Sequence, residues 1–518
     1  MSIASKVAND KTHQIFLAQD PAIHDAEMTQ VSDELKSLVR NAAAEAESLD
    51  TVERHIFDEL FKIGRSAINL FLALQGNGDL GETVCTAADV TLERSDEPAD
   101  RELRTVFGQH LFQSFVYAKG PHQKIELRPL DARMALPEGI DSYYFEELSQ
   151  FFCVEQAFGR SREAISTTLK QEVCEAQLQA INHRMGEQAR AYMEQLPVPP
   201  RAEEGEILVQ TGDGKGVPLV KSDAARVPVT GDAPQRPGNR RMATLASVYS
   251  VDRYFRTADD VLAALFRDPD RPRKNDRPKP QFKELRACFA HKYEDSPGVE
   301  VEVSGAFEAF TWAADRVRLR LKPGQDLVRL LDGQESLRKT SETCLEAGTT
   351  ATDILDIIHV AGYVKRAAKV FHKSQKHREA FSRDMLEKIL NGQVTSVIHG
   401  LRVKAGQRHL KGKPLKEVTT VCGYFKNNAD RMRYDEYLQQ GYPIATGVIE
   451  GACKHLVKDR MERTGMRWCL PNAQAMLNVR AVFQSSWWDA FQQHRMQTEQ
   501  KLIHANRALV NGYKPLCV

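Results

Sequence analysis

The chain has 518 residues, of which 42% are apolar and 27% are charged, and its formal net charge is +1. This length predicts two to four domains, and no stretch approaches the run of about eighteen apolar residues that a membrane span needs. The nine cysteines form no Cys-x-x-Cys pair and the N-terminus lacks a signal-peptide pattern. We therefore expect a protein of a reducing, intracellular compartment without a zinc finger.

The sequence pattern changes several times along the chain and predicts six parts. Residues 30 to 75 carry apolar side chains at helical spacing, for example at Ile56, Leu60 and Ile63. The six parts are 1–100 (N-terminal helical region), 101–200 (β-hairpin plus helix-turn-helix), 201–375 (first part of an α/β core), 376–440 (basic helical insertion), 441–490 (second part of the core) and 491–518 (C-terminal tail).

The second part combines a hairpin pattern with a pair of helices. Residues 104–130 alternate in polarity and contain a Lys-Gly-Pro break, which is typical of a β-hairpin. A helix that begins after Ser142, a break at 158–161 and a second helix capped by Ser161 fit a helix-turn-helix. Plain helix packing explains this pair equally well. Residues 195–206, rich in proline and then acidic, are the best linker.

After the linker, strand and helix patterns alternate, which predicts an α/β fold with a sheet flanked by helices. Apolar strands are expected at 206–220 and 242–251, and a proline-rich, charged loop at 268–282. Two more strands end in acids, one at Asp332 and one at Asp356 and His359. A helix is expected at 306–320.

The last predicted core element is a single amphipathic helix over residues 445–468, with Glu450 in its first turn. Glu450, Asp213 and Asp332 all lie at the ends of predicted elements, where active-site groups of α/β sheets gather. Three converging carboxylates repel one another unless a cation is present, and their oxygens suit two Mg²⁺ or Mn²⁺ ions. Each acid also has a simpler interpretation, as a turn residue or as a partner of the helix dipole.

Four sequence stretches resemble the DDE transposases of bacterial insertion sequences. These stretches are TGDGKGVPLV, LLDGQESL, DILDIIHVAGYV and ATGVIEGACKHLVKDRMERTGMRW. The resemblance implies an RNase H-like catalytic core with a helical insertion, preceded by a mostly α-helical DNA-binding region. It implies that Asp213, Asp332 and Glu450 are the three catalytic, metal-binding acids.

The pair Asp356 and His359 matches the Asp-x-x-His signature of Mutator-like and hAT-like transposases. The resemblance leaves Asp356 as a supporting group or as the alternative second acid, and His359 is equally well a core histidine that tethers Asp356. The chain departs from these relatives in one respect, because its predicted hairpin lacks paired cysteines. Zinc-assisted DNA binding there is not expected.

Basic side chains near Glu450 and in the insertion are the candidate DNA contacts, since phosphates beside a metal site need counter-charges. The alternatives are a solvated surface for the lysines and arginines, salt bridges of Lys454 and Lys458 to Glu450, and packing for the tryptophan. The candidates are Lys454, Lys458, Arg460, Arg463, Arg467, Trp468, Arg402, Lys404 and Arg408.

Together these patterns predict a transposase that binds the ends of its element and catalyses metal-dependent strand cleavage and strand transfer. Its partner would be double-stranded DNA, both the terminal repeats of the element and the target DNA, and the protein would act as a homodimer or higher oligomer on DNA. We expect it in the bacterial cytoplasm, associated with the nucleoid and not with a membrane. The alternatives are an RNase H-like nuclease without strand transfer and a domesticated DNA-binding protein.

Overall fold

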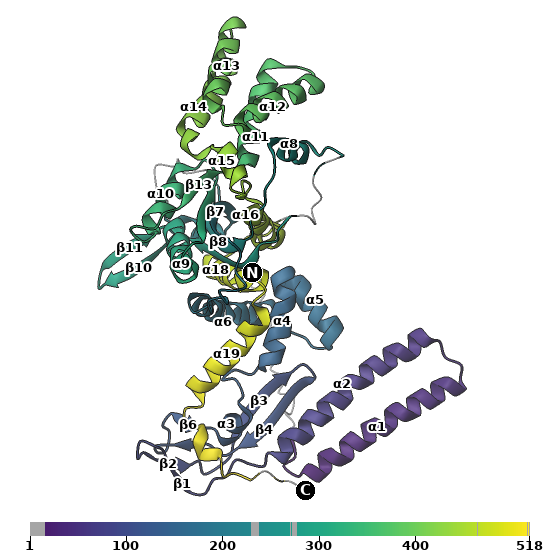
Figure 1. Cartoon of the computed structure of the whole chain (residues 1–518). Helices are drawn as coiled ribbons and strands as arrows, with labels where there is room; N and C mark the ends of the chain where they lie inside the picture. Colours follow the sequence, from purple (N-terminus) through teal and green to yellow (C-terminus); the bar gives the residue numbers. More distant parts are fainter. Residues whose placement is uncertain are drawn as a thin grey trace, which may run out of the picture. The chain divides into compact units, whose positions relative to one another are not determined.

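The computed structural model describes residues 16–228, 238–269, 271, 277–463, 465–514 and 516. Its fold is mixed α/β (Figure 1) and divides into two compact units. The terminal unit comprises Met1–Ile181 and Gln492–Val518, and the central unit comprises Asn182–Phe491. None of the helices in the described ranges is long and apolar enough to cross a membrane.

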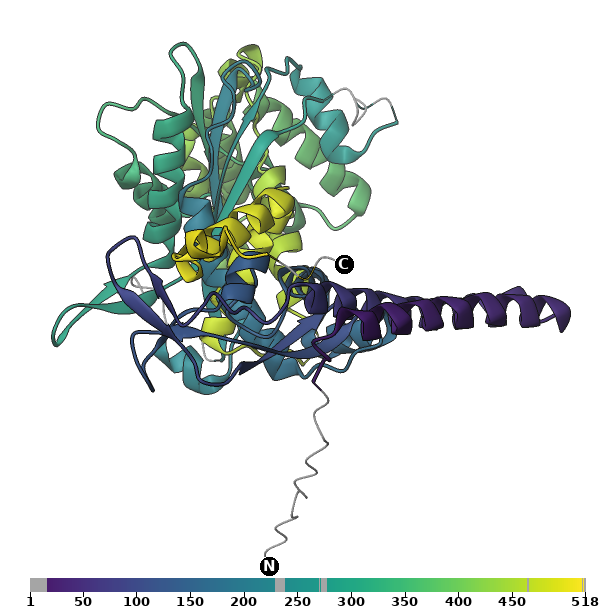
Figure 2. The same ribbon diagram turned by 90° about the horizontal axis from the view of Figure 1, so that it is seen from below.

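The N-terminal helical region is confirmed as two long helices, α1 (Pro21–Ala44) and α2 (Leu49–Leu74), which run side by side (Figure 2). The Ser48 side chain accepts a hydrogen bond from the Thr51 backbone N–H and so caps the start of α2. Helix does not extend to residue 100, because short strands follow. They are β1 (Thr83–Cys85) and β2 (Thr91–Arg94).

The hairpin of the terminal unit lies earlier in the chain than the range 104–130 in which it was expected. Its strands β3 (Ala99–Thr105) and β4 (Gly108–Ser114) pair antiparallel around residues 106–107. The Lys-Gly-Pro break at Lys119 instead separates two shorter strands that join β1 and β2 in a sheet. These are β5 (Tyr117–Ala118) and β6 (Ile125–Leu127).

Two helices, α4 (Tyr143–Glu155) and α5 (Phe158–Leu169), form the expected helical pair, but their junction differs from the prediction. Ser142 caps α4, whereas Ser161 lies inside α5 and is fully buried. The Ser161 backbone N–H already bonds to the Ala157 carbonyl, so the helix begins before the glycine. The short helix α3 (Pro129–Met134) precedes this pair, and α6 (Glu175–Glu194) follows it.

The C-terminal residues form helices rather than a tail. They are α19 (Trp488–Ile503) and the 3-10 turn η4 (Arg507–Val510). Arg495 forms a buried ion pair with Glu146 of α4, and Val510 packs in the core beside Tyr117. The end of the chain therefore completes the terminal unit.

The central unit is built on a five-stranded sheet in the order β13-β12-β7-β8-β9. Only β8 runs antiparallel to the other strands. The expected loop at 268–282 lies partly outside the described residues, at 270 and 272–276, and it ends where β9 begins. The strands are β7 (Ile207–Pro218), β8 (Arg240–Val251), β9 (Gln281–Phe289), β12 (Asp326–Leu331) and β13 (Thr352–Leu355), and a separate hairpin is formed by β10 (His291–Ser296) and β11 (Val299–Val303).

Helices cover both faces of this sheet, because alternate side chains of each strand point to opposite faces. On one face Gln210 bonds to Ser341 of α10, and Phe310 of α9 leaves no space for a side chain at Gly212. On the other face Ile207 and Val209 share a core with the helices of the insertion. The helices are α9 (Gly305–Arg320) and α10 (Glu335–Cys344) on the first face, and α8 (Ala258–Phe266), α11 (Ile357–Phe371), α12 (Gln375–Leu390), α13 (Val394–Gln407), α14 (Gly412–Asn427) and α15 (Tyr434–Gln439) on the second.

The predicted linker is part of the central unit rather than a boundary. Arg316 donates hydrogen bonds to the carbonyls of Leu196 and Pro197, and Arg320 pairs with Glu204 at 3.0 Å. Both arginines also pair with Glu284 of β9, and all these charged side chains are buried. The two units divide instead at residues 181 and 491, within α6 and α19.

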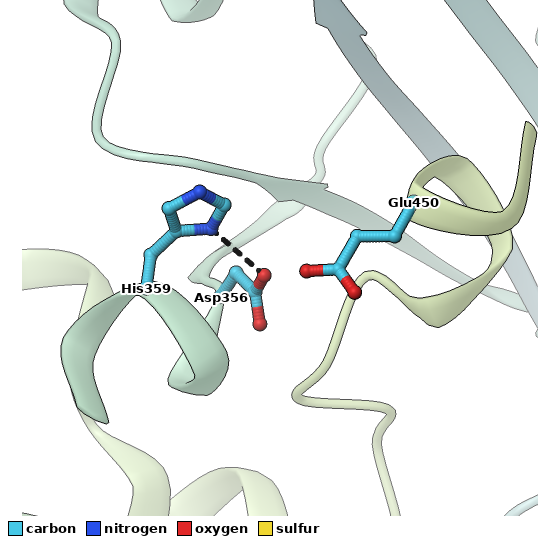
Figure 3. Close-up of side chains that lie close together, drawn as sticks. All are labelled: Asp356, His359 and Glu450. Atoms are coloured by element: carbon cyan, nitrogen blue, oxygen red, sulfur yellow. Dashed lines mark hydrogen bonds and ion pairs between the residues drawn. The ribbon is translucent and has the colours of Figure 1, made fainter. Parts of the chain in front are cut away.

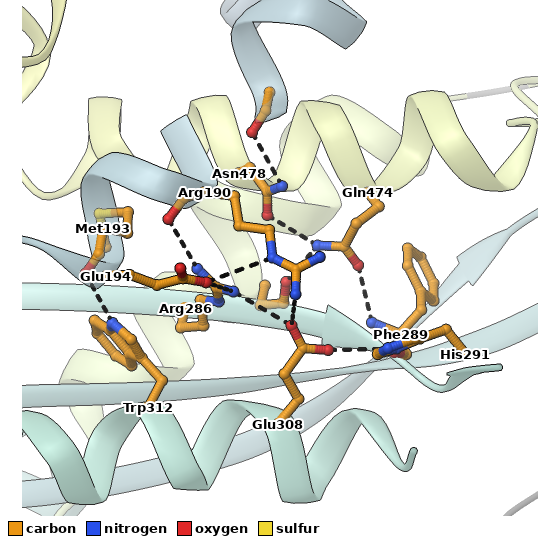
Figure 4. Close-up of polar contacts among 12 residues, drawn as sticks. Arg190, Met193, Glu194, Arg286, Phe289, His291, Glu308, Trp312, Gln474 and Asn478 are labelled. Carbon is orange, nitrogen blue, oxygen red and sulfur yellow. Dashed lines mark hydrogen bonds and ion pairs between the residues drawn. The ribbon is translucent and has the colours of Figure 1, made fainter. Parts of the chain in front are cut away.

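A polar network fixes α18 (Leu470–Gln484) along β9 (Figure 4). Gln474 of α18 donates to the Ala287 carbonyl and accepts from the Phe289 N–H, which satisfies the backbone of this edge strand. Arg286 of β9 contacts Glu194 and Glu308 at 3.4 and 3.3 Å. The network thus joins the end of α6, the sheet edge, α9 and α18.

The single helix expected over 445–468 is divided into three segments and ends at Met461. A π-helical turn, η3 (Cys453–Lys458), separates α16 (Gly447–Ala452) from α17 (Asp459–Met461). Such turns shift the direction in which later side chains point and are frequent at functional sites. Trp468 lies beyond the helix, in a β-bridge with Leu219.

Candidate active site

The strand register brings three aspartates side by side, although Asp213 lies within β7 rather than at its end as expected. Leu331 of β12 lies opposite Gly212 of β7 on one side and Leu355 of β13 on the other. Because these strands are parallel, the next residue of each lies at the same level, where β12 and β13 end and β7 continues beside β8. Those residues are Asp213, Asp332 and Asp356.

The structure brings Asp356, His359 and Glu450 closest together (Figure 3). One potential ligand atom of each residue lies within 4.8 Å of the others. Asp356 is fully buried and accepts hydrogen bonds from the His359 ring at 3.0 Å, from the Ile358 N–H at 2.9 Å and from the Thr446 hydroxyl. Glu450 approaches from α16, with its carboxylate directed toward that of Asp356.

Asp213 and Asp332 lie beside this cluster and have partners of their own. The Cys453 thiol donates to Asp213 at 3.4 Å, and the Gly214 N–H donates to its other oxygen at 2.6 Å. Asp332 accepts from the Gln334 N–H at 2.9 Å. Within the described part of the chain, the expected metal set of Asp213, Asp332 and Glu450 is therefore not the group whose ligand atoms converge most closely.

The acids lie close enough together to change one another's pKa values. Burial, together with the charge of Asp213, raises the pKa of Asp332. Burial and the charge of Asp356 raise the pKa of Glu450, although His359 opposes this. The hydrogen bond to Asp356 raises the pKa of His359 to about 9, and the charges of Asp332 and Asp213 add to the effect. A bound cation would offset this accumulation of negative charge.

The donor set fits a divalent cation. The carboxylates of Asp356 and Glu450 are the hard oxygen ligands that Mg²⁺ and Mn²⁺ prefer, and the imidazole of His359 adds a nitrogen that Mn²⁺ tolerates better than Mg²⁺. Since Nδ1 of His359 is engaged by Asp356, only its Nε2 is left to face a ligand. This pairing is typical of a carboxylate that orients a histidine.

The helical insertion supports the strand ends that carry the acids, which the sequence did not indicate. Arg431 donates to the Asp332 carbonyl at 3.2 and 3.3 Å. The hydroxyls of Tyr434 and Tyr437 donate to the carbonyls of Leu355 at 2.7 Å and Asp353 at 3.0 Å. The only sequence signal is the cluster of arginine and tyrosine in RMRYDEYL, because helical spacing does not reveal which strand such residues meet.

The candidate DNA contacts beside Glu450 fall into two groups. Four are exposed on or after the helix: Lys454, Lys458, Arg463 and Arg467. The other two, Arg460 and Trp468, are only 1% and 5% exposed, and the guanidinium of Arg460 lies 4.8 Å from the Trp468 ring centre. The Trp468 indole N–H donates to the Met461 carbonyl. This geometry favours packing over base stacking for Trp468, and it places Arg460 away from solvent.

The candidate contacts in the insertion also differ from one another. Arg402 is exposed on α13. The Lys404 ammonium lies 4.8 Å from the ring centre of Phe381, and Arg408 lies over the ring of Phe371 and donates to its carbonyl. Lys404 and Arg408 therefore contribute to packing between helices as well as to surface charge.

No known family model matches this chain, and no curated protein matches it.

Proposed function

We propose that this chain is a DNA transposase of the DDE type. The observation that carries the proposal is the pairing of β7 with β12, because it sets Asp213 and Asp332 side by side at the carboxyl end of β12. Glu450 faces the same edge from α16, after a helical insertion. This order of two aspartates and a glutamate is the one that the transposase-like sequence motifs imply.

The same proposal gives the central unit an RNase H-like core. In chain order within this core the sheet runs 3-2-1-4-5, with only the second strand antiparallel, and helices pack on both faces. The insertion of α12 to α15 lies between the last strand and the glutamate helix, where the motifs imply it. These features support the assignment independently of the acids.

We assign Asp213, Asp332 and Glu450 as ligands of two Mg²⁺ or Mn²⁺ ions. Bound there, the ions would activate a water or a 3′-hydroxyl and stabilise the leaving oxygen of a phosphodiester. Asp356 and His359 are assigned as supporting groups, because three hydrogen bonds already hold the Asp356 carboxylate. The competing assignment makes Asp356 the second acid, and its closeness to Glu450 favours it.

The DNA contacts are divided between the two units. Lys454, Lys458, Arg463 and Arg467 project from the glutamate helix and the segment after it, and would neutralise phosphates near the cut. In the terminal unit the pair α4 and α5 is the candidate for recognition of the element's ends. Assembly as a homodimer or higher oligomer on DNA remains part of the proposal.

The test is cleavage and joining of a supercoiled plasmid that carries the coding region with its native flanks. Wild-type protein with Mg²⁺ or Mn²⁺ should release and join the element's ends, whereas Asp213→Asn and Glu450→Gln should bind the DNA but cut none of it. Glu436→Gln is the matched control, because Glu436 is an exposed carboxylate paired with Arg433 on α15.

Two other results would replace the proposal. Cutting without joining would indicate an RNase H-like nuclease. Binding of end DNA by the wild-type protein, with no cutting in either cation, would indicate a domesticated DNA-binding protein.

A further inference from the structure

The thiol of Cys453 contacts the first acid of the proposed metal site. Its sulfur lies 3.4 Å from one oxygen of Asp213 and donates a hydrogen bond to it. Cys453 is buried and is the first residue of the π-helical turn η3, directly after α16. A thiol has an ordinary pKa of about 8.5, so it keeps its proton at neutral pH and acts as the donor. The contact therefore joins the segment after Glu450 to Asp213.

Asp213 depends on such a partner because the sheet ends beside it on one side. β12 ends at Leu331, opposite Gly212, so this strand does not continue along Asp213. Alternate side chains of a strand point to opposite faces, so Asp213 points away from α9, which packs against Gly212. The Gly214 N–H holds one carboxylate oxygen at 2.6 Å and the thiol holds the other. Each oxygen keeps a second lone pair with which it can bind a cation.

Cys453 and Glu450 lie on the same side of their helical segment. They are three residues apart, a spacing that places two side chains one above the other. Burial and the charge of Asp356 raise the pKa of Glu450, and the charge of Asp213 adds to the rise, so Glu450 is also near Asp213. One helical turn thus directs a carboxylate to the proposed metal site and a donor to the acid on β7.

We propose that Cys453 is a positioning residue, whose thiol holds the Asp213 carboxylate in the orientation that binds metal and ties α16 to β7. This inference rests on the proposed function, which assigns Asp213 and Glu450 as metal ligands. Partners that orient metal ligands typically contribute about 10- to 100-fold to metal affinity or activity. Because a thiol is a weak donor, we expect the lower end of this range.

The alternative is that Cys453 only fills the space between η3 and β7. Cys453→Ala removes the donor, whereas Cys453→Ser keeps a donor on a side chain of similar shape. Cys453→Val removes the donor but fills the space, and it gives the same test if the alanine variant does not fold. Cys422→Ala is the matched control, because the Cys422 thiol is also buried but donates to the Ile398 carbonyl, within the insertion.

Binding of Mn²⁺ to the full chain, followed by electron paramagnetic resonance of the free ion, gives a readout that does not require cleavage. Cys453→Ala should raise the dissociation constant about 10-fold. Cys453→Ser should restore most of the affinity, and Cys422→Ala should bind as the wild type does. In plasmid cleavage, Cys453→Ala should need about 10-fold more Mn²⁺ for its half-maximal rate and should approach the wild-type rate when Mn²⁺ is saturating.

Three results would overturn the inference and leave the proposed function intact. They are wild-type Mn²⁺ affinity in Cys453→Ala, equal losses in Cys453→Ala and Cys453→Ser, and equal losses in Cys453→Ala and Cys422→Ala. Absence of cleavage by the wild-type protein in both Mg²⁺ and Mn²⁺ would instead overturn the proposed function, and this inference with it.

Discussion

In the proposed metal site two neighbouring aspartates, Asp332 and Asp356, are candidates for the second ligand, and their surroundings differ in a way that mutations can test. Asp332 accepts one backbone hydrogen bond, whereas Asp356 is fully buried and accepts three. We therefore expect Asp332→Asn to abolish plasmid cleavage, as loss of a metal ligand should. Asp356→Asn and His359→Ala should leave cleavage weakened about 10- to 100-fold, as loss of a supporting partner does.

The measurement is initial cleavage rate in Mg²⁺ and in Mn²⁺, with folding of each variant checked by circular dichroism. Activity of Asp332→Asn at the wild-type level, together with none for Asp356→Asn, would reverse the assignment. The cluster of Asp356, His359 and Glu450 would then be the metal site.

The protonation of His359 should make the stability of the protein depend on pH. The hydrogen bond to Asp356 raises the pKa of His359 to about 9 in the folded state, above its ordinary value of 6.5. Because the folded-state pKa is the higher one, the stabilisation is complete below about pH 6.5 and is lost as the pH rises through about 9. We expect the stability difference between wild type and His359→Ala to shrink over that interval.

Urea unfolding in EDTA between pH 5.5 and 9.5 would measure this difference. His399→Ala, at an exposed position on α13, controls for the loss of a histidine as such. A difference between wild type and His359→Ala that stays constant or grows with pH would contradict the expectation.

At the scale of elements, the central unit depends on a buried ion cluster that holds α9 against β9. Glu284 is fully buried and pairs with Arg316 at 2.8 Å and with Arg320 at 3.0 Å. Glu284→Gln would leave the buried guanidinium of Arg316 without its charge partner, while Arg320 would keep Glu204, so we expect a loss of about 3–5 kcal/mol in the free energy of unfolding. Glu300→Gln, which removes one of the two exposed partners of Lys292 on the hairpin, should cost less than about 1 kcal/mol.

Chemical denaturation of both variants would compare these two ion pairs directly. Equal and small losses would show that the partners the arginines keep are sufficient, namely the carbonyls of Leu196 and Pro197 for Arg316 and the carboxylate of Glu204 for Arg320.

The elements with strong apolar periodicity could be predicted from the sequence, and those set by tertiary contacts could not. The expected strand at 242–251 and the helix at 306–320 correspond to β8 and α9 within two residues at each end. The edge strand β9 was missed, because its charged Glu284 and Arg286 are buried only through partners far along the chain. The π-helical turn in the glutamate helix likewise leaves no mark in the spacing of apolar residues.

In the candidate site, too, the residues in local motifs could be predicted, and those placed by tertiary contacts could not. Asp213, Asp332, Asp356 and Glu450 were found because short motifs place acids at predicted strand and helix ends. Arg431, Tyr434 and Tyr437 were not found, since their part depends on contacts with strand ends far earlier in the chain, and no local pattern encodes such contacts.

At the scale of the whole molecule, the first and last residues belong to one unit. Arg495 pairs with Glu146, and the Tyr513 hydroxyl accepts a hydrogen bond from the Gly78 N–H at 3.0 Å. We therefore expect a chain truncated after Phe491 to lose the fold of the terminal unit. Limited proteolysis should cut it within residues 16–181 and spare the central unit, and end-DNA binding should be lost.

Leu502→Ala is the control for this truncation, because Leu502 lies in the removed segment but is 76% exposed and should tolerate the change. Resistance of the truncated chain to protease across α4 and α5 would show that the C-terminal helices are dispensable.

Because the terminal unit is built from both ends of the described chain, the order of synthesis affects the order in which the two units fold. Domains generally fold as they are synthesised, beginning with the N-terminal one. Here the residues up to Ile181 are made before the central unit, but the segment from Gln492 that completes their unit is made after it. The central unit therefore finishes folding before the unit whose synthesis began first. An mRNA truncated after the codon for Phe491 would therefore yield a protein with its acidic cluster formed but with an incomplete terminal unit.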